Sequence, residues 1–409
     1  MNVKTYDNQQ KIAFIVCYFG VLPWYYKLFV KTCSSNPGVD FFIITNCEAD
    51  DLLAQNVHLV RMELKEIQQL ACLKFGFEAE LSGPYKLCDY KPAYGFLFSD
   101  ITAGFDFWGH CDLDLIFGDI RSVLKNNLLA FYDVITARQN YLAGFFTLFR
   151  NNDYCNTLFM RSPDFKKVFQ DSYCYGFDEF NYLPDNSSSL VYMTDVIRSE
   201  VDSRRLKAYF FNLAIEGIPG NLKWDNGVLT NEQGQVLLLY HLNTFKNQFF
   251  YYPTKWKQLP DMFFVNDFYF SKYSPWSLRG RLNSINNRLK KHCYKLFYYI
   301  RQYSNWSVKY ISGKTFFLHS QSKLTKFQGK YRGDGIEVIV STCEGLFSVE
   351  WKGNTYLLIH SNESHFVLNK FFVGGLINVS VEFGICSETS RETLKLSSFR
   401  SPQLILYKK

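Results

Sequence analysis

The sequence predicts an α/β domain with a mainly parallel sheet, followed by a basic helical linker and a separate all-β domain. Short apolar runs alternate with segments of helical spacing in the first part of the chain, which is the pattern of strand–helix–strand units. The segment Ser271–Tyr310 then carries nine Lys or Arg and no Asp or Glu. Beyond Ser312, short alternating runs separated by turns indicate strands alone. The expected division is 1–265, 266–311 and 312–409.

The composition is that of a globular protein with a large core. The 409 residues are 47% hydrophobic and 20% charged, which allows two or three domains. The aromatic content of 18% suits surfaces that stack on bases or sugars, and equally an aromatic-rich core. The net charge of +7 is mild, so we expect no nucleic-acid partner. Scattered cysteines, 11 in all, and no signal-peptide pattern predict a cytoplasmic protein. Gly20, Pro23 and Lys27 interrupt the apolar stretch Ile12–Val30, which argues against a membrane span.

Strands and helices alternate at the start of the chain. Continuous apolar runs predict buried strands at Lys11–Phe19, Phe41–Thr45 and Val57–Val60. Apolar residues at helical spacing predict helices at Tyr25–Cys33 and Glu63–Phe75. Ligands of such sheets bind beyond the carboxyl ends of the strands. The end of the first strand, at Tyr18, Phe19 and Gly20, is therefore one expected wall of a site.

The chain is organised around Phe105–Asp119, which reads FDFWGHCDLDLIFGD. Its aromatic and apolar residues predict a buried strand whose end projects Asp112 and Asp114. Two carboxylates this close repel each other, and burying them unpaired costs roughly several kcal/mol each. Oxygen ligands suit a hard cation, so a Mg²⁺ or Mn²⁺ site is one interpretation. An Asp-rich turn after a strand is the other, because D-x-D is a short motif.

The elements after the two aspartates supply further polar candidates. A helix is expected at Ile120–Ala130, and strands are expected at Tyr132–Ala137, Ala143–Phe149, Leu222–Leu229 and Val236–His241. Asp178 and Glu179 lie in an aromatic loop, YGFDEFNY, where a raised pKa would suit a general base. A helix cap or a salt-bridge partner is the more common explanation of such a pair. His241 closes an apolar run, with Lys246 five residues later.

The basic segment and the C-terminal part are different in kind. Apolar residues interleave the cations of Ser271–Tyr310, which predicts an amphipathic helix lying on an anionic membrane surface or, alternatively, a linker helix packed on the core. We expect a small sandwich beyond Ser312, with strands at Thr315–His319, Ile336–Ser341, Leu346–Trp351, Tyr356–His360, Phe366–Val367, Ile377–Phe383 and Leu404–Tyr407.

Four ordered blocks resemble the glycosyltransferases of bacterial surface-polysaccharide clusters, of capsule or O-antigen type, between Lys11 and Pro253. The blocks are VCYFGVLPWYYKLFVKTCSSNP, PYKLCDYKPAYG, FDFWGHCDLDLIFGDI and GFFTLFRN. The resemblance implies the GT-A fold, which is Rossmann-like, and a D-x-D motif that binds a divalent metal, Mn²⁺ or Mg²⁺. The C-terminal β domain lies outside the resemblance.

The resemblance also implies roles for individual residues. Asp112, Asp114 and His241 would bind the metal, with Asp112 also close to the ribose or sugar of the donor. Lys246 would contact the donor phosphates. Other donor contacts are expected from Tyr18, Phe19 and Gly20 on the base, from Lys86 on phosphate and from Asp89 on sugar hydroxyls. Glu179 or Asp178 would be the base of an inverting enzyme.

The expected reaction is hexosyl transfer from a nucleotide sugar, favouring a UDP-sugar, to a glycan acceptor. Surface polysaccharides are commonly built on lipid carriers, so the resemblance implies a lipid-linked glycan and a protein peripheral to the inner membrane face. Two other classes stay open. One is a metal-dependent phosphotransferase or nucleotidyltransferase, although the chain has no glycine-rich phosphate loop. The other is a non-catalytic carbohydrate-binding protein.

Overall fold

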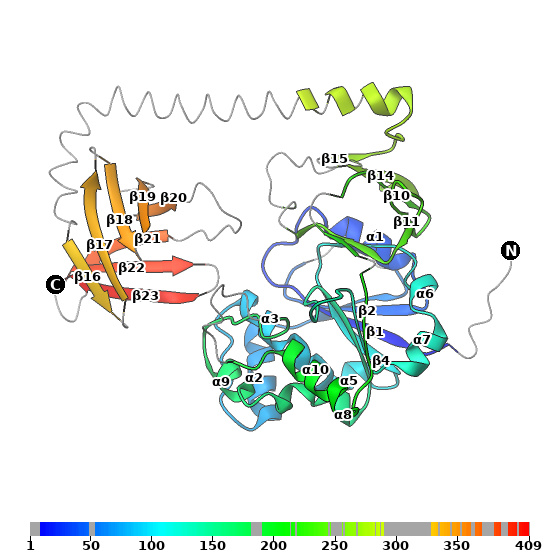
Figure 1. Ribbon diagram of the computed structural model, residues 1–409, viewed down its shortest axis with the longest axis horizontal. Coiled ribbons are helices and arrows are strands. Elements are labelled where there is room, and N and C mark those ends of the chain that lie inside the picture. The colour runs from blue at the N-terminus through cyan, green and yellow to red at the C-terminus, as the bar shows by residue number, and fades with distance from the viewer. Residues whose placement is uncertain are drawn as a thin grey trace. The chain divides into compact units, whose positions relative to one another are not determined.

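The computed structural model describes two compact units, Met1–Lys295 and Leu296–Lys409 (Figure 1). In the first, the described residues are 9–48, 54–180, 190–212, 214–216, 219–243, 246, 256, 258–266, 269–282, 284–286 and 288–289. In the second, they are 329–333, 336–343, 346–351, 354–360, 365–369, 380–385, 392–398 and 401–408. The expected boundaries after residues 265 and 311 stay predictions.

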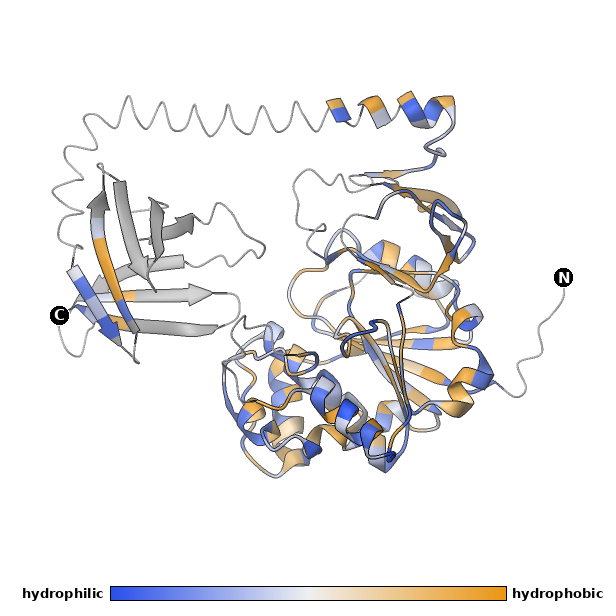
Figure 2. Ribbon diagram, in the orientation of Figure 1, coloured by the Kyte–Doolittle hydropathy of each residue, from blue (hydrophilic) through white to orange (hydrophobic). Residues whose placement is uncertain are grey.

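A seven-stranded sheet forms the centre of the first unit, in the order β3-β2-β1-β4-β7-β6-β8. Its strands are β1 (Ile12–Cys17), β2 (Val39–Thr45), β3 (Val57–Arg61), β4 (Phe107–Cys111), β6 (Val134–Thr136), β7 (Phe146–Arg150) and β8 (Ala208–Phe210). Neighbours are parallel except where β7 runs antiparallel to β4 and to β6. Apolar residues line these strands (Figure 2). The predicted α/β domain with a mainly parallel sheet is confirmed.

Close packing brings β1 and β4 together in the middle of the sheet. The Phe14 ring of β1 stacks on Phe41, with centroids 5.6 Å apart. A Cβ at Gly109 of β4 would lie 2.6 Å from the Phe14 ring and 2.7 Å from the carbonyl oxygen of Thr147, so the strand has room only for glycine there. Because β1 and β4 are parallel neighbours, their carboxyl ends meet at one edge of the sheet.

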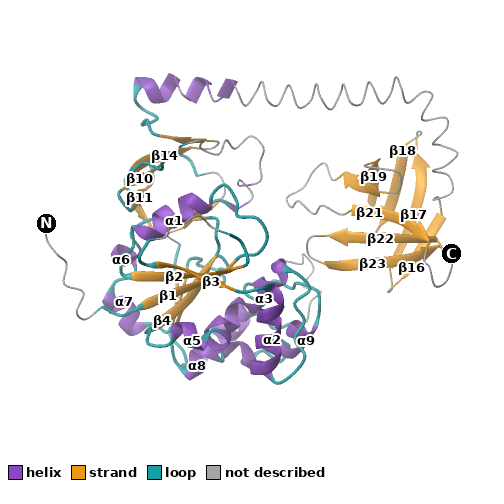
Figure 3. Cartoon of the chain, turned by 180° about the vertical axis from the view of Figure 1, so that it is seen from behind, coloured by secondary structure: helices purple, strands orange, loops and turns teal. Residues whose placement is uncertain are grey.

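Helices cover both faces of the sheet (Figure 3). The helix α1 (Tyr26–Ser34) buries Phe29 in the same apolar cluster as Phe14. The helix α2 (Leu64–Phe75) buries Ile67 on the opposite face, with Ile15. Other described helices are α3 (Leu87–Tyr90), α4 (Tyr94–Leu97), α5 (Ser99–Thr102), α6 (Ile120–Val123), α7 (Asn126–Phe131), α8 (Asp153–Asn156), α9 (Phe165–Gln170), α10 (Met193–Asp202) and the 3-10 turns η1 (Pro84–Lys86), η2 (Lys91–Ala93) and η3 (Leu158–Arg161).

Two smaller sheets stand beside the central one. The first has the order β12-β11-β10-β14-β15 and consists of β10 (Leu222–Asp225), β11 (Val228–Thr230), β12 (Val236–Leu237), β14 (Met262–Asn266) and β15 (Tyr269–Ser271). The second contains β5 (Leu115–Phe117), β13 (Leu239–His241) and β9 (Ala214–Glu216), with β13 in the middle. In this sheet His241 is the register partner of Leu115 on β5 and of Glu216 on β9.

Three predicted elements are divided in the structure. The predicted helix Ile120–Ala130 is two short helices, α6 and α7, because Leu124 has φ −86° and ψ 73°, outside the helical region. The predicted strand Leu222–Leu229 turns at Asn226-Gly227, whose φ values of 47° and 91° suit a two-residue hairpin turn. The predicted strand Val236–His241 is shared between two sheets, as β12 and β13.

In the second unit, the described segments are β16 (Gly329–Gly333), β17 (Ile336–Cys343), β18 (Leu346–Trp351), β19 (Asn354–His360), β20 (His365–Asn369), β21 (Ser380–Ile385), β22 (Glu392–Ser398) and β23 (Ser401–Lys408). Consecutive strands pair antiparallel, and β23 pairs with β16, so they form one closed barrel where the sequence predicted a sandwich. The predicted strand Thr315–His319 lies outside the described residues.

The basic segment begins directly after β15. Residues 278–282, 284–286 and 288–289 are helical, and the predicted continuation over 290–310 lies outside the described residues. Among the helices that the structure describes, none has both the length and the apolar character needed to cross a membrane.

Candidate functional site

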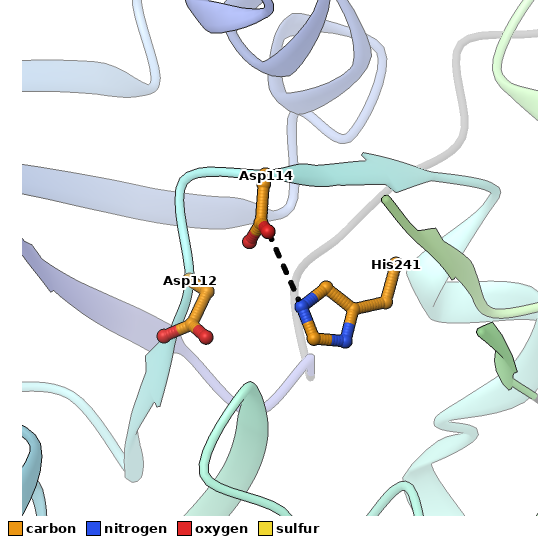
Figure 4. Close-up of side chains that lie close together, drawn as sticks. All are labelled: Asp112, Asp114 and His241. Atoms are coloured by element: carbon orange, nitrogen blue, oxygen red, sulfur yellow. Dashed lines mark ion pairs between the residues drawn. The ribbon is translucent and has the colours of Figure 1, made fainter. Parts of the chain in front are cut away.

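Three potential metal ligands converge at the carboxyl end of β4. Asp112 follows β4 directly, Asp114 precedes β5, and His241 ends β13. Because β13 pairs with β5, the register sets His241 beside the two aspartates. One ligand atom from each of the three side chains lies within 4.8 Å of the others, and the three side chains face a common space (Figure 4). We call these residues the Asp–Asp–His cluster.

Charge compensation inside this cluster centres on Asp114, which is buried. The Nε2 atom of His241 lies 3.3 Å from Asp114 Oδ2, and Lys246 Nζ donates to the same oxygen. Burial alone would raise the pKa of Asp114, but the charges of His241 and Lys246 hold it below its usual value. Burial also opposes the charge of His241, yet Asp114 raises the pKa of this imidazole to about 9.

A second carboxylate sets the orientation of the imidazole. Glu216 Oε1 lies 2.8 Å from His241 Nδ1 and also accepts a hydrogen bond from Asn243. Arg138 donates to the other carboxylate oxygen of Glu216. A proton held on Nδ1 leaves Nε2 free to bind a metal, which is the arrangement of many metal-ligating histidines. Sequence reasoning missed Glu216 and Arg138, because only the pairing of β9 with β13 brings Glu216 to His241.

The donor set fits a divalent cation. Two carboxylates and one imidazole offer oxygen and nitrogen ligands, which suit Mn²⁺ and, less fully, Mg²⁺. Among the described residues, Asp112 Oδ2 and Asp114 Oδ1 accept no hydrogen bond, so each aspartate keeps one oxygen for a ligand. Binding would displace the proton on His241 Nε2, because only neutral imidazole ligates a metal.

Lys91 connects Asp112 to a second group of carboxylates. Its side chain is buried, and Nζ lies 2.6 Å from Asp112 Oδ1, 3.0 Å from the carbonyl oxygen of Gly144 and 3.4 Å from Asp178 Oδ2. Burial lowers the pKa of Lys91, but Asp112, Cys88 and Asp178 together outweigh this effect and keep the pKa well above its usual value. We call Lys91, Asp112, Gly144, Asp178 and Glu179 the Lys91 cluster.

Gly144 positions Glu179, one of the two residues predicted to act as the general base. Its N–H donates to Glu179 Oε1 at 2.7 Å. A Cβ at Gly144 would lie 2.2 Å from Asp178 Oδ2 and 2.9 Å from Glu179 Oε1, so a larger residue would displace both carboxylates. Burial raises the pKa of Glu179 to about 7 and that of Asp178 well above its usual value. Both carboxyl groups therefore take up protons more readily than ordinary acids, as a general base requires.

The residues predicted to contact the nucleotide base of the donor lie at the end of β1, next to β4. Tyr18 is half-buried and its hydroxyl donates to the carbonyl oxygen of Val21 at 3.0 Å. Phe19 is buried, while Gly20 is exposed and has φ +111°, a conformation that favours glycine. Burial raises the pKa of Tyr18, and the charges of Lys246 and Asp114 also act on its phenol. Tyr18 is therefore within electrostatic reach of the Asp–Asp–His cluster.

Lys86 and Asp89 are buried and paired with each other, with Nζ 2.8 Å from Asp89 Oδ2. Lys86 also donates to the carbonyl oxygens of Val168 and Tyr173, each at 2.6 Å, and Asp89 accepts from the N–H of Phe177 at 2.8 Å. These contacts fix the position of the segment that precedes Asp178 and Glu179. Contact of Lys86 and Asp89 with the donor stays a prediction, whereas Lys91, which sequence reasoning left without a role, reaches Asp112.

Comparison with known proteins places the chain in a family. No curated protein sequence matches it. The model described as "Family of unknown function (DUF6625)" matches residues 14–260. The chain belongs to the DUF6625 family.

Two solved structures are similar to this DUF6625 protein over part of its length. One is the galactosyltransferase LgtC in complex with donor and acceptor sugar analogues, at 9% identity and a TM-score of 0.28, covering 50% of this chain and 75% of that one. The other is mouse xyloside xylosyltransferase 1 in its apo form, at 9% identity and a TM-score of 0.29, covering 50% and 87%. The DUF6625 match itself includes the whole of both the Asp–Asp–His cluster and the Lys91 cluster.

Proposed function

We propose that this protein is a metal-dependent glycosyltransferase that moves a sugar from a nucleotide-sugar donor, favouring a UDP-sugar, to a glycan acceptor. The observation that carries the proposal is the convergence of Asp112, Asp114 and His241 at the carboxyl end of a central strand, with Lys246 on the same carboxylate. A divalent cation held by the three ligands, together with Lys246, would place positive charge at the phosphates of a sugar–diphosphate. Such a site, rather than the overall fold, is what argues for an activity.

On the donor side, each residue has a distinct proposed task. Asp112, Asp114 and His241 would hold a divalent cation, Mn²⁺ or Mg²⁺, and Glu216 would orient the imidazole. A cation bound there would stabilise the negative charge of the departing diphosphate. Lys246 would move from Asp114 to the phosphates and neutralise charge that grows in the transition state. Tyr18, Phe19 and Gly20 would contact the nucleotide base of the donor, because β1 ends beside β4.

On the acceptor side, Glu179 is the proposed general base for an inverting transfer, with Asp178 as its neighbour. Burial raises the pKa of Glu179 to about 7, so its carboxylate can accept the proton of an acceptor hydroxyl near neutral pH. Lys91 would act as a positioning residue, because it contacts Asp112 on the donor side and Asp178 on the acceptor side.

The resemblance of the four sequence blocks supports a more specific assignment. It favours a GT-A hexosyltransferase of surface-polysaccharide synthesis, of capsule or O-antigen type. The acceptor would be a lipid-linked glycan, and the enzyme would act in the cytoplasm at the inner membrane face.

A thermal-shift panel of nucleotide sugars, with and without Mn²⁺, tests the proposal. We expect one UDP- or GDP-sugar to stabilise the wild type only in the presence of metal. Asp114→Asn should lose this metal-dependent stabilisation, and Asp112→Asn tests the same site if the first variant does not fold. Asp100→Asn is a matched control, because Asp100 is an exposed aspartate on α5, away from both clusters.

Three results would contradict the proposal. If Asp114→Asn binds the donor in the presence of Mn²⁺ as tightly as the wild type does, Asp114 is not a metal ligand. Stabilisation by free glycans alone would favour a carbohydrate-binding protein. Metal-dependent consumption of a nucleoside triphosphate without sugar transfer would favour a phosphotransferase or nucleotidyltransferase.

A further inference from the structure

A continuous apolar stripe on the helix after β15 is exposed. Leu278, Leu282, Ile285 and Leu289 follow one another at intervals of four, three and four residues, which places them along one line of an α-helix. Their exposed fractions are between 55% and 76%, and Trp276, just before the helix, is 56% exposed. Burying five such side chains would remove a large apolar area from water, so this stripe is a candidate docking surface.

Arginines border the stripe on both sides. With about 3.6 residues per turn, Arg279 falls on one flank of the stripe, and Arg281 and Arg288 fall on the other. All three are exposed. The segment Ser271–Tyr310 contains nine Lys or Arg and no Asp or Glu. Figure 2 shows the resulting alternation of apolar and polar residues along this helix.

We propose that this stripe, Trp276 to Leu289 with its flanking arginines, docks the protein on an anionic lipid surface. Leucine and isoleucine side chains would enter the boundary between headgroups and acyl chains, with Trp276 at its polar edge. Arginine side chains can lie along an apolar surface while their guanidinium groups stay in water, which places them at the lipid phosphates. The net positive charge of Ser271–Tyr310 matches an anionic leaflet.

Two other occupants fit the stripe less well. A second copy of this helix would form a two-helix seam in which the residues that flank the apolar positions face each other. Arg279, Arg281 and Arg288 would then meet arginines of the other copy, and like charges there are destabilising. Nucleic acid would use the arginines, but it has no apolar surface to cover four aliphatic side chains.

Vesicle co-sedimentation of the full-length protein tests the proposal, and it needs neither donor nor metal. Vesicles of phosphatidylcholine with phosphatidylglycerol should bind the wild type, and vesicles of phosphatidylcholine alone should bind it weakly. Each cation near an anionic surface strengthens binding about fivefold, so Arg279→Gln with Arg281→Gln should weaken it roughly 25-fold. Added salt should weaken wild-type binding for the same reason.

A second variant tests the apolar contribution, and a third is the control. Leu282→Asn with Leu289→Asn should also release the protein from anionic vesicles, because the arginines alone bind only loosely. The control changes an exposed lysine and an exposed leucine of α2, by Lys65→Gln with Leu73→Asn, and should bind as the wild type does. Thermal melting should be the same for all three variants, because every altered side chain is exposed.

Four results would overturn the proposal. Equal binding to both vesicle types would remove the role of charge. If both stripe variants bind anionic vesicles as tightly as the wild type does, another surface of the protein contacts the lipid. A dimer in sedimentation equilibrium that Leu282→Asn with Leu289→Asn dissociates, with vesicle binding unchanged, would assign the stripe to a second copy. Tight oligonucleotide binding lost in the arginine variant, without vesicle binding, would assign it to nucleic acid.

Discussion

Replacing Lys91 by methionine should destabilise the protein strongly, because this lysine is the cation shared by two carboxylates. The lysine side chain is 10% exposed and its Nζ contacts Asp112, Asp178 and the Gly144 carbonyl. Methionine keeps the length of the stem and removes the charge. Three acceptors then lose a donor, and the buried carboxylate of Asp178 keeps no cation beside it among the described residues.

The expected loss follows from the cost of leaving a buried charge unpaired. Breaking a buried ion pair on one side costs about 3–5 kcal/mol. The side chain of Asp112 is 33% exposed, so water compensates part of the lost interaction. We therefore expect the free energy of unfolding to fall by about 3 kcal/mol. That corresponds to a lowering of Tm by roughly 5 °C, because the entropy of unfolding of a unit of this size is about 0.6 kcal/mol/K.

The pH dependence of this loss is a stricter test than its size. Burial already raises the pKa of Asp178 well above its usual value, so its charged form is the unfavourable one. Removing Lys91 makes the charged form still less favourable. Because protonation relieves the uncompensated charge, the gap between variant and wild type should be largest at pH 8 and should shrink as the pH falls.

Thermal and urea unfolding of wild type, Lys91→Met and the exposed control Lys65→Met, each at several pH values, measures these effects. Mn²⁺ should recover part of the stability of Lys91→Met, since a cation beside Asp112 replaces some of the lost charge. A Lys91→Met protein as stable as Lys65→Met at pH 8 would refute the reasoning, because it would mean that Asp112 and Asp178 are solvated without the lysine.

Two further predictions concern the proposed reaction. If Glu179 is the general base, its carboxylate form must be present, so kcat should rise with pH through about 7, the raised pKa of Glu179, and Glu179→Gln should lower kcat roughly 10²-fold with donor affinity unchanged. An equal loss of donor affinity in Glu179→Gln would indicate a structural role instead. Glu216→Gln should weaken Mn²⁺ binding by about 10–100-fold in calorimetry, because the group that orients His241 loses its charge. Full Mn²⁺ affinity in Glu216→Gln would exclude His241 as a ligand held in this way.

Much of the fold could be predicted from local sequence pattern. Continuous apolar runs predicted β1 and β2, because strands covered on both faces need apolar residues at every position. The alternation of these runs with helical spacing predicted the mainly parallel sheet, since parallel neighbours require a crossover between them. Local pattern placed the two aspartates after β4, whereas the resemblance to a glycosyltransferase family implied that they share a site with His241. The structure brings the three side chains together.

Where distant segments meet could not be predicted in the same way. Glu216 lies in no motif, and Lys91 and Gly144 lie in two of the four blocks without a role assigned to them. Each reaches the site only through tertiary contacts. The segment Pro84–Gly95 shows the limit most clearly. Lys86 and Lys91 look alike in sequence, yet Lys86 pairs with Asp89 and Lys91 with Asp112.

The physical reason lies in the difference between burial and pairing. Apolar periodicity determines which face of an element is buried, and that property belongs to the element itself. The partner of a buried charge depends on which carboxylate the packed neighbours bring within a few ångströms. The sequence by itself therefore determined the sheet and the two aspartates, whereas only the tertiary structure decided that Lys91, Gly144 and Glu216 complete their surroundings.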